Sequence, residues 1–359
     1  MSTTTSTTTA QPVRWGFLGC GKISSDYANA MKNVSGAVLQ ACAARSLTSA
    51  QDFAKAHGFA RAHGTYEELV SDAEVDVVYI GTLHISHYEH SLLALNHGKH
   101  VVVEKPMTMN AREAAHVTSL AKEKNLFFLE GMWTRFFPAV CYISELIETK
   151  AIGDVHFVSA DIGFPFTPDN DRIWQRKLGG GGLLDIGIYP LAFVTLALGG
   201  KPEKVTAVGK LSEDGVDMYG SVSLQYSENR FGTIQYTCLS MFQEALTIVG
   251  SKGRILIASS AHVPTTVTTF IQQAEGSFSY SEKVTHFPAA PSHPNTTPLN
   301  FGGSEGFYYE IEAVVRAIQS QKTQLDEYSP QESVEIMTIM DEIRKQIGVV
   351  YDADLKAQN

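Results

Sequence analysis

Two side chains far apart in the sequence, Lys105 and Tyr189, are of types that together can move a proton. Lys105 follows the apolar run 101–103 within a Glu-Lys-Pro tripeptide, and the carboxyl end of a strand is where open α/β sheets bind ligands. An ammonium beside a phenol favours tyrosinate and lowers the phenol pKa from its usual value of about 10. If the two meet, Tyr189 can act as a general base toward a hydroxyl. The plainer alternative for Lys105 is a surface ion pair with Glu104.

Asp185 precedes Tyr189 by four residues in an apolar segment that begins with four glycines, residues 179–182. Asp is almost never buried unless it is paired. Residues four apart on a helix share a face, so we expect Asp185 to hold a hydroxyl next to the one that Tyr189 deprotonates. The alternative is purely structural, with a core tyrosine and an aspartate that caps a helix.

A glycine-containing loop, Gly19-x-Gly21-x-x-Ser24, follows the first apolar run and opens the first helical pattern. Glycines there let the backbone approach a pyrophosphate, whose charge meets the free amides at the start of the helix. Ser24 replaces the usual third glycine with another small residue. The loop predicts a dinucleotide site that includes Lys22 and Ile23; the alternative is a tight turn without a ligand.

The residues after the second apolar run indicate which dinucleotide binds. NAD-binding proteins usually carry an Asp or Glu there for the ribose hydroxyls, whereas this chain has Ala-Ala-Arg-Ser and no acid. Arg45 can fork onto a ribose 2′-phosphate, and Ser46 can add a hydroxyl. We therefore predict NADP as the cofactor in preference to NAD. The alternative is that Arg45 is a solvated surface charge.

Together these residues predict hydride transfer between a nicotinamide cofactor and a carbon that bears a hydroxyl, in either direction. Lys105, Tyr189 and Asp185 are the predicted catalytic residues. The predicted cofactor contacts further include, beyond the two loops, Thr82, His84, Glu104 and Lys105.

Three histidines spaced three apart, His84, His87 and His90, raise the question of a metal site. That spacing drifts off one helical face, and no carboxylate or cysteine accompanies them in a ligand-like pattern. We predict no metal; the histidines are polar residues at a helix start, with His84 facing the cofactor.

Aromatic residues and an arginine, Trp133 and Arg135, follow the last strand of the first half and fit a substrate wall. A core at the hinge between domains is the alternative. Phe164, Trp174 and Phe301 are assigned to the same substrate pocket, although the pattern alone does not fold residues 162–177 and 288–303.

The order of elements predicts two domains. Up to residue 130 short strands (13–18, 37–43, 75–80, 101–103, 126–129) alternate with helices (to about 32, 47–57, 86–96, 111–124), as in a parallel sheet with helices on both faces. Beyond residue 130 come helices 139–148 and 183–198, the latter kinked by Gly187 and Pro190, and strands 155–161, 204–211, 218–226, 231–239, 245–249 and 254–258. Short turns between these strands predict an antiparallel sheet, and helices 304–320 and 330–347 close the chain. Residues 288–300 are expected to form a surface loop.

Composition narrows the function further. The chain has 359 residues and a net charge of −10, which argues against nucleic acid or anionic membrane as a partner. No uninterrupted apolar run reaches the ~20 residues of a membrane span. Four cysteines without a CxxC pair predict reduced thiols and a cytoplasmic location. Residues 1–10, a Ser/Thr tract, are predicted to be a disordered tail and not a signal peptide.

The glycine loop, the Glu-Lys-Pro tripeptide and the segment 183–189 resemble the glucose–fructose oxidoreductase, inositol dehydrogenase and MocA (Gfo/Idh/MocA) family. Within it the chain is most similar to the dimeric dihydrodiol dehydrogenases and fungal NADP-dependent D-xylose dehydrogenases. The resemblance implies an N-terminal Rossmann domain (residues 11–130) and a C-terminal α/β domain (131–359). The second domain would carry an open, mostly antiparallel sheet that binds substrate and forms a homodimer.

The resemblance also implies roles for residues. Lys105 would orient nicotinamide and substrate, Tyr189 would stand at the acid/base position that is often His, and Asp185 would be the family's nearby aspartate. Trp133 and Arg135 would match that branch's substrate wall. The implied substrates are aldopyranoses such as D-xylose, oxidised to the lactone, or trans-dihydrodiols. The alternatives are a non-catalytic NADP-binding regulator of the same fold and an NADPH-dependent reductase of a small carbonyl compound.

Overall fold

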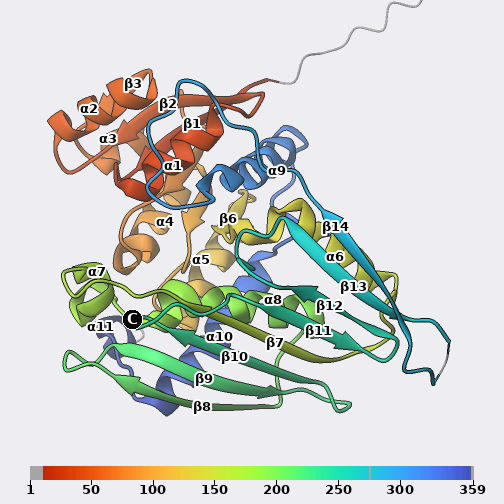
Figure 1. Cartoon of the computed structure of the whole chain (residues 1–359). Helices are drawn as coiled ribbons and strands as arrows, with labels where there is room; N and C mark the ends of the chain where they lie inside the picture. The colour runs from red at the N-terminus through yellow and green to blue at the C-terminus, as the bar shows by residue number, and fades with distance from the viewer. Residues whose placement is uncertain (1–10, 275, 357–359) are drawn as a thin grey trace, which may run out of the picture.

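The computed structural model describes residues 11–274 and 276–356, so the predicted tail, residues 1–10, lies outside the described residues. Two sheets organise the chain (Figure 1). The six-stranded first sheet has the order β3-β2-β1-β4-β5-β6, and the eight-stranded second sheet the order β14-β13-β12-β11-β7-β10-β9-β8. The expected α/β fold with two different sheets is confirmed.

The first sheet is parallel throughout and alternates with helices. Its elements are β1 (Val13–Leu18), α1 (Lys22–Met31), β2 (Ala37–Ala43), α2 (Leu47–His57), β3 (Arg61–His63), α3 (Tyr66–Val70), β4 (Val77–Ile80), α4 (His87–Asn96), β5 (His100–Glu104), α5 (Ala111–Glu123) and β6 (Phe128–Gly131). The strand order reverses between β1 and β4, and ligands bind at the carboxyl ends of strands beside such a switch point. The predicted glycine loop therefore lies at the expected binding edge.

The second part of the chain contains the larger sheet and most of the remaining helices. Its elements are α6 (Pro138–Glu148), β7 (Val155–Gly163), α7 (Asp171–Trp174), α8 (Ile188–Leu198), β8 (Lys204–Leu211), β9 (Asp217–Gln225), β10 (Phe231–Thr237), β11 (Leu246–Gly250), β12 (Gly253–Ile257), β13 (Thr266–Gln272), β14 (Tyr280–His286), α9 (Phe307–Gln319), α10 (Pro330–Ile347) and α11 (Asp352–Leu355). Neighbouring strands are antiparallel except for β7 and β10, which pair in parallel.

Six α-helices and strands escaped the sequence prediction: β3, α3, α7, β13, β14 and α11. The strand β3 has three residues at a sheet edge, too few to show a period. Helix α3 has five residues, but its Thr65-x-x-Glu68 capping box is a signal that the sequence carries. Strands β13 and β14 lie in a stretch rich in Thr and Val, and the pairing of Thr266–Gln272 with Tyr280–His286 extends the sheet beyond the predicted strands.

Helices α8 and α10 cover one face of the second sheet. Added side-chain atoms at Gly232 and Gly209 would contact Val194 of α8 and Ile347 of α10, so the backbone of the sheet lies close to both helices. The segment Arg176–Leu198, which includes α8, is long and apolar enough by composition to cross a membrane, yet 94% of its most apolar window is buried inside the fold. It is therefore a core segment of the second domain.

The end of the chain crosses back onto the first domain. Residues 288–303, of which 288–300 were predicted as a surface loop, run along α1 without regular structure (Figure 1). The buried Asp26 of α1 accepts hydrogen bonds from the backbone N–H groups of Asn300 (2.9 Å) and Phe301 (2.9 Å), and Asn29 donates to the Thr297 carbonyl (2.9 Å). Helix α9 follows, and the buried Tyr27 hydroxyl donates to Glu310 (3.2 Å).

Replacement of Asp26 by Ala should release this loop. The substitution leaves the backbone N–H groups of Asn300 and Phe301 without their acceptor and removes one hydrogen bond of the Asn300 side-chain amide, which costs about 3 kcal/mol. We expect a lower urea midpoint and faster hydrogen exchange at the amides of Asn300 and Phe301. Asp52→Ala on the exposed side of α2 is the control. Unchanged exchange at both amides would show that the loop does not depend on Asp26.

Candidate functional site

The structure brings Lys105 and Tyr189 together. Lys105 directly follows β5, and its Nζ lies 5.1 Å from the centre of the Tyr189 ring at the start of α8. The same Nζ donates to the backbone carbonyl of Asp185 (2.6 Å) and lies 3.8 Å from Asp185 Oδ1. The ammonium thus joins the carboxyl edge of the first sheet to the glycine-led segment of the second domain.

Two buried carboxylates fix the segments that carry this pair. Glu130 of β6 accepts hydrogen bonds from the Met107 backbone (2.7 Å) and the Tyr328 hydroxyl (2.9 Å), which holds the turn after Lys105. Asp217 of β9 accepts from the backbone N–H of Leu183 (2.7 Å), the first residue of the turn that carries Asp185. Each buried acceptor gives the adjoining backbone one defined position.

The segment before α8 corrects one prediction. The sequence predicts one kinked helix over 183–198, whereas Leu183–Gly187 form a π-helical turn and α8 begins at Ile188. Glycines make this possible because a Cβ at Gly182 or Gly187 would lie 2.9 Å or 3.1 Å from the Tyr236 ring. Single π-turns are frequent at functional sites, since they redirect side chains within a helix.

Asp185 has a partner that the sequence did not suggest. Arg172 of α7 forms an ion pair with its carboxylate through both Nη atoms. Burial would raise the pKa of Asp185, but Arg172 and then Lys105 outweigh it and hold the pKa well below its usual range. Asp185 is therefore an ionised, partnered carboxylate, and its role as a hydroxyl ligand stays a prediction. Arg172 lies in residues 162–177, which the pattern could not fold.

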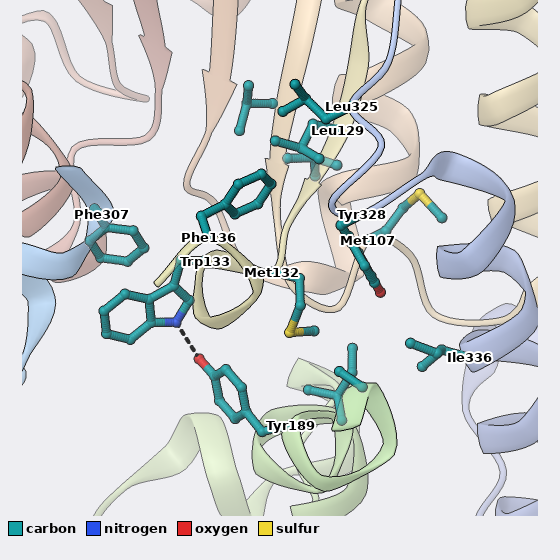
Figure 2. Close-up of a cluster of buried hydrophobic side chains, with 14 of the residues drawn as sticks. Met107, Leu129, Met132, Trp133, Phe136, Tyr189, Phe307, Leu325, Tyr328 and Ile336 are labelled. Atoms are coloured by element: carbon teal, nitrogen blue, oxygen red, sulfur yellow. Dashed lines mark hydrogen bonds between the residues drawn. The ribbon is translucent and has the colours of Figure 1, made fainter. Parts of the chain in front are cut away.

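The predicted drop in the Tyr189 pKa is wrong. Burial raises the pKa of the Tyr189 phenol, and the opposing effects of the Lys105 ammonium and a hydrogen bond from Trp133 are smaller. Trp133 Nε1 donates to Tyr189 Oη at 2.8 Å, drawn as the dashed line in Figure 2. The sequence assigned Trp133 to the substrate wall and did not foresee this contact. Tyr189 in this structure is a protonated phenol at neutral pH.

Aromatic rings surround the phenol. Trp133 stacks on Phe307 with ring centres 4.5 Å apart, and Figure 2 shows Trp133 between Phe307 and Tyr189. His262 lies 5.6 Å from the Tyr189 ring and 5.8 Å from the Phe164 ring, so Phe164 is near the site as predicted. His262 was missed because it lies in the loop after β12, without any motif around it.

Trp174 and Phe301, the other two residues predicted for the substrate wall, make no contact with Tyr189 among the interactions of the described residues. Trp174, next to Arg172 in α7, donates its Nε1 to the Thr167 carbonyl (2.7 Å). The Phe301 ring is 44% exposed on the loop that runs along α1. Their substrate roles stay predictions.

Arg135 does not belong to the wall. Its guanidinium is buried, donates to Glu332 of α10 (2.6 Å) and the Ala192 carbonyl of α8 (3.3 Å), and lies over the Tyr328 ring. A buried guanidinium requires such partners because desolvation of an unpaired charge is costly. The alternative of a hinge core, and not a substrate wall, is correct for this residue.

The glycine loop has the geometry of a dinucleotide site. Gly19 has φ +92°, and a Cβ there would lie 2.9 Å from the Thr82 methyl, whereas a Cβ at Gly21 would face open space. Helix α1 begins at Lys22 with no side-chain cap and no acid in its first turn, so its amides and positive end are free for an anion. Ser24 packs against Gly81, which compensates for the missing third glycine. The residues present fit a bound pyrophosphate.

Arg45 and Ser46 follow β2 as predicted and are both exposed. The Ser46 hydroxyl also accepts from the Ser49 backbone (3.5 Å) and caps α2. Both residues are therefore at the edge where a bound dinucleotide would place its ribose.

The predicted cofactor contacts Thr82 and Glu104 lie in different surroundings. Thr82 is half-buried after β4, with its hydroxyl 3.0 Å from His90 Nδ1. The prediction that Glu104 contacts the cofactor is wrong, because its carboxylate is buried in the interior and accepts a hydrogen bond from the Tyr79 hydroxyl (2.9 Å). The Lys105 ammonium, by contrast, contacts the Asp185 carbonyl of the second domain. Burial raises the pKa of Glu104 to about 7.

The three histidines have separate partners. His84 Nε2 lies 2.7 Å from the Gly179 carbonyl and links the first domain to the glycine run. His87 lies between the carbonyls of Pro106 (2.8 Å) and Thr82 (3.0 Å). Burial lowers the pKa of His84 to about 4, so its neutral ring acts as a bridge between the domains.

Comparison with known proteins identifies the family. A model of an oxidoreductase family with an NAD-binding Rossmann fold (GFO/IDH/MocA) matches residues 13–132, and the GFO/IDH/MocA C-terminal domain matches residues 140–256. The trans-1,2-dihydrobenzene-1,2-diol dehydrogenase of Danio rerio is 39% identical over 345 residues, 95% of this chain and 99% of the relative. The chain belongs to the Gfo/Idh/MocA oxidoreductase family.

A further relative and two solved structures are similar to nearly the whole chain. The human trans-1,2-dihydrobenzene-1,2-diol dehydrogenase is 33% identical over 345 residues, which are 95% of this chain and 99% of the human protein. A 3-ketoreductase from Actinomadura kijaniata, solved with NADP and TDP-benzene, shares the fold with TM-score 0.78 and 24% identity over 95% of this chain and 99% of that chain. Levoglucosan dehydrogenase, solved with NADH and levoglucosan, shares the fold with TM-score 0.81 and 20% identity over 94% of this chain and 98% of that chain.

The raised pKa of Glu104 predicts a pH-dependent stability difference. The folded chain holds the neutral carboxyl more tightly than the unfolded chain does, so this contribution is complete below about pH 4.5 and is lost as pH rises through about 7. Between about pH 5 and pH 8, wild type should lose about 3 kcal/mol of unfolding free energy relative to Glu104→Gln.

Urea unfolding of both proteins across this pH range measures the difference. All other ionisations are common to the two chains and cancel. Parallel pH curves would mean that Glu104 ionises normally in the fold.

Proposed function

We propose that the chain is an NADP-dependent dehydrogenase that transfers a hydride between the cofactor and a hydroxyl-bearing carbon of a trans-diol or a sugar. The observation that carries the proposal is the contact of Lys105 with Tyr189 at the carboxyl edge of the sheet that also carries the free amides of α1. The names of the relatives at 33–39% identity support the choice of diol or sugar as substrate class.

A bound nicotinamide dinucleotide supplies the hydride acceptor or donor. The protein supplies the proton transfer: Tyr189 takes the hydroxyl proton during oxidation and returns it during reduction. Lys105 favours the tyrosinate electrostatically, and the Trp133 N–H stabilises the same oxygen at 2.8 Å. Arg172 keeps Asp185 ionised, and the Asp185 carbonyl fixes the Lys105 ammonium beside the ring.

The raised pKa of Tyr189 also supports the reverse reaction as a second candidate. A phenol that is protonated at neutral pH is ready to donate to a carbonyl oxygen, as in an NADPH-dependent reductase. Oxidation needs the tyrosinate, so its rate should rise with pH while reduction slows. A non-catalytic regulator has no use for a proton-transfer pair, and the Lys105–Tyr189 contact argues against it.

Replacement of Tyr189 by Phe tests the proton carrier. The variant keeps the ring that contacts Lys105 and loses only the hydroxyl, so turnover should fall about 10²- to 10⁴-fold. NADPH binding, followed by cofactor fluorescence, should stay within about twofold, because a phenol hydroxyl is not a phosphate ligand. Turnover is measured by nicotinamide absorbance with a panel of sugars and trans-diols. Full activity in the variant would remove Tyr189 from the mechanism.

Replacement of Arg45 by Ala tests the preference for NADP. Loss of a guanidinium–phosphate contact should raise the KM for NADP at least about tenfold, with KM for NAD nearly unchanged. Lys55→Ala, which removes an exposed charge from α2 of the same domain, is the control. Equal KM values for NADP before and after the Arg45 change would contradict a 2′-phosphate contact.

We also propose a homodimer formed through the open face of the second sheet, opposite α8 and α10. Val208, Tyr219 and Phe231 on this face are 66%, 42% and 36% exposed, and such exposed apolar groups favour an interface. Tyr219→Glu combined with Phe231→Glu should convert a dimer into a monomer in sedimentation velocity. Leu355→Glu, at an exposed position of α11, should leave the dimer intact. A wild-type monomer would refute the proposal.

A cytoplasmic location is proposed on the four unpaired thiols. Cys20, Cys42, Cys141 and Cys238 are all free, and free thiols are typical of reducing compartments.

A further inference from the structure

A histidine–glutamate pair lies beside Tyr189 and is not used by the mechanism above. Nδ1 of His262, in the loop after β12, forms a hydrogen bond with Oε2 of Glu244, in the loop before β11. The His262 ring is close to three aromatic rings: its centre is 5.6 Å from Tyr189, 5.8 Å from Phe164 and 6.2 Å from Trp133. His262 therefore lies beside the Tyr189 ring as part of the second domain, whereas Lys105 contacts the same ring from the first domain.

The hydrogen bond to Glu244 determines what His262 can offer a ligand. A carboxylate only accepts, so Nδ1 carries the hydrogen and Nε2 is the free nitrogen. No partner for Nε2 is recorded in the part of the chain that the structure describes, and the side chain is 16% exposed. Nε2 accepts a hydrogen bond when the ring is neutral and donates one when it is protonated. A hydroxyl group can complement either state, because it both donates and accepts.

The backbone holds this pair in place. The Glu244 N–H donates to Asp161 Oδ1 of β7 (2.9 Å), and the Glu244 carbonyl accepts from the Ala261 N–H (2.9 Å). Glu244 has φ +57°, the left-handed region that non-glycine residues seldom adopt. Such residues persist where their surroundings fix them, and they cluster at functional sites. These hydrogen bonds hold the two loops together. They fix the backbone at Ala261, the residue before His262, and so keep the imidazole beside the aromatic rings.

The surroundings of His262 have the composition of a small-molecule site. Trp133, Phe164 and Tyr189 supply apolar walls, and the imidazole adds one polar group among them. Ligand sites combine such walls with a small number of placed polar groups that set orientation and specificity. A sugar or trans-diol has a second hydroxyl next to the reacting one, at a distance that suits a second polar contact near the phenol.

We propose that His262 is a specificity-determining residue whose Nε2 binds a second hydroxyl of the substrate, adjacent to the hydroxyl that Tyr189 deprotonates. Glu244 is the positioning residue that fixes the imidazole. The inference rests on the proposed function, since Tyr189 defines which hydroxyl is the first. It explains chemically why a vicinal diol would be preferred to a simple alcohol: a site that hydrogen-bonds a hydroxyl discriminates strongly against an analogue that lacks it.

Two small probes isolate the second hydroxyl: trans-cyclohexane-1,2-diol and cyclohexanol. Isothermal titration calorimetry of the full chain with NADP present measures their equilibrium binding, independently of turnover. Wild type should bind the diol about tenfold more tightly than cyclohexanol, a factor that one net hydrogen bond can supply. In His262→Phe, which keeps an aromatic ring, diol binding should weaken about tenfold and cyclohexanol binding should change less than about twofold.

His286→Phe is the matched control. His286 is an exposed histidine of β14 in the same domain, with its Nδ1 3.1 Å from the Thr266 hydroxyl. Its replacement should leave the binding of both probes unchanged. The proposal is overturned if His262→Phe weakens both probes equally, if it weakens neither, or if wild type binds neither probe.

Glu244→Gln tests the positioning role. A neutral amide no longer dictates the tautomer, so the ¹⁵N resonance of His262 Nε2 should shift, and the diol should bind severalfold more weakly with cyclohexanol unaffected. An unchanged ¹⁵N resonance, or an equal loss for both probes, would overturn this role.

Turnover separates the inference from the proposed function. If the diol is bound through His262 but no hydride transfer occurs with NADP or NAD, the proposed function fails and the hydroxyl contact stands. If the diol is oxidised but His262→Phe alters the two probes alike, the proposed function stands and the hydroxyl contact fails.

Discussion

The Lys105 ammonium is the interaction on which the site depends. It lies where the carboxyl end of β5 meets the π-helical turn before α8, donates to the Asp185 carbonyl and covers the Tyr189 ring. Buried charges persist only with partners, and within the described residues the hydrogen-bond, ion-pair and ring contacts of this one come from Asp185 and Tyr189 of the second domain. The ammonium therefore ties the nucleotide-binding sheet to the segment that carries the phenol.

The balance of charge around the phenol decides its protonation. Burial opposes the tyrosinate more strongly than Lys105 and Trp133 favour it. Arg172 neutralises Asp185, which would otherwise add a further negative charge beside the ring. The site thus holds a neutral phenol between a cation and an N–H donor, an arrangement that can deliver a proton and, at higher pH, take one.

Sequence patterns predicted most of the first sheet because parallel strands buried on both faces are continuous apolar runs between helical periods. They also located Lys105, Tyr189 and the glycine loop, since glycine and charged residues stand out in apolar surroundings. They misplaced Arg135 and Glu104, because a residue's type does not say which face of a strand or turn it occupies. They missed Arg172, which lies in a helix of only four residues, and His262 and Glu244, which lie in loops; none of these segments is long enough to show a period.

The sequence by itself determined the fold class and the family and singled out the phenol and the ammonium as candidates for proton transfer, because these depend on local periodicity and on short motifs. Only the tertiary structure decided the electrostatics of the site. The pKa of Tyr189, the Arg172–Asp185 pair and the His262–Glu244 pair each depend on contacts between different segments of the chain. Burial and through-space charge have no counterpart in sequence spacing, since they depend on which loops the folded core brings together.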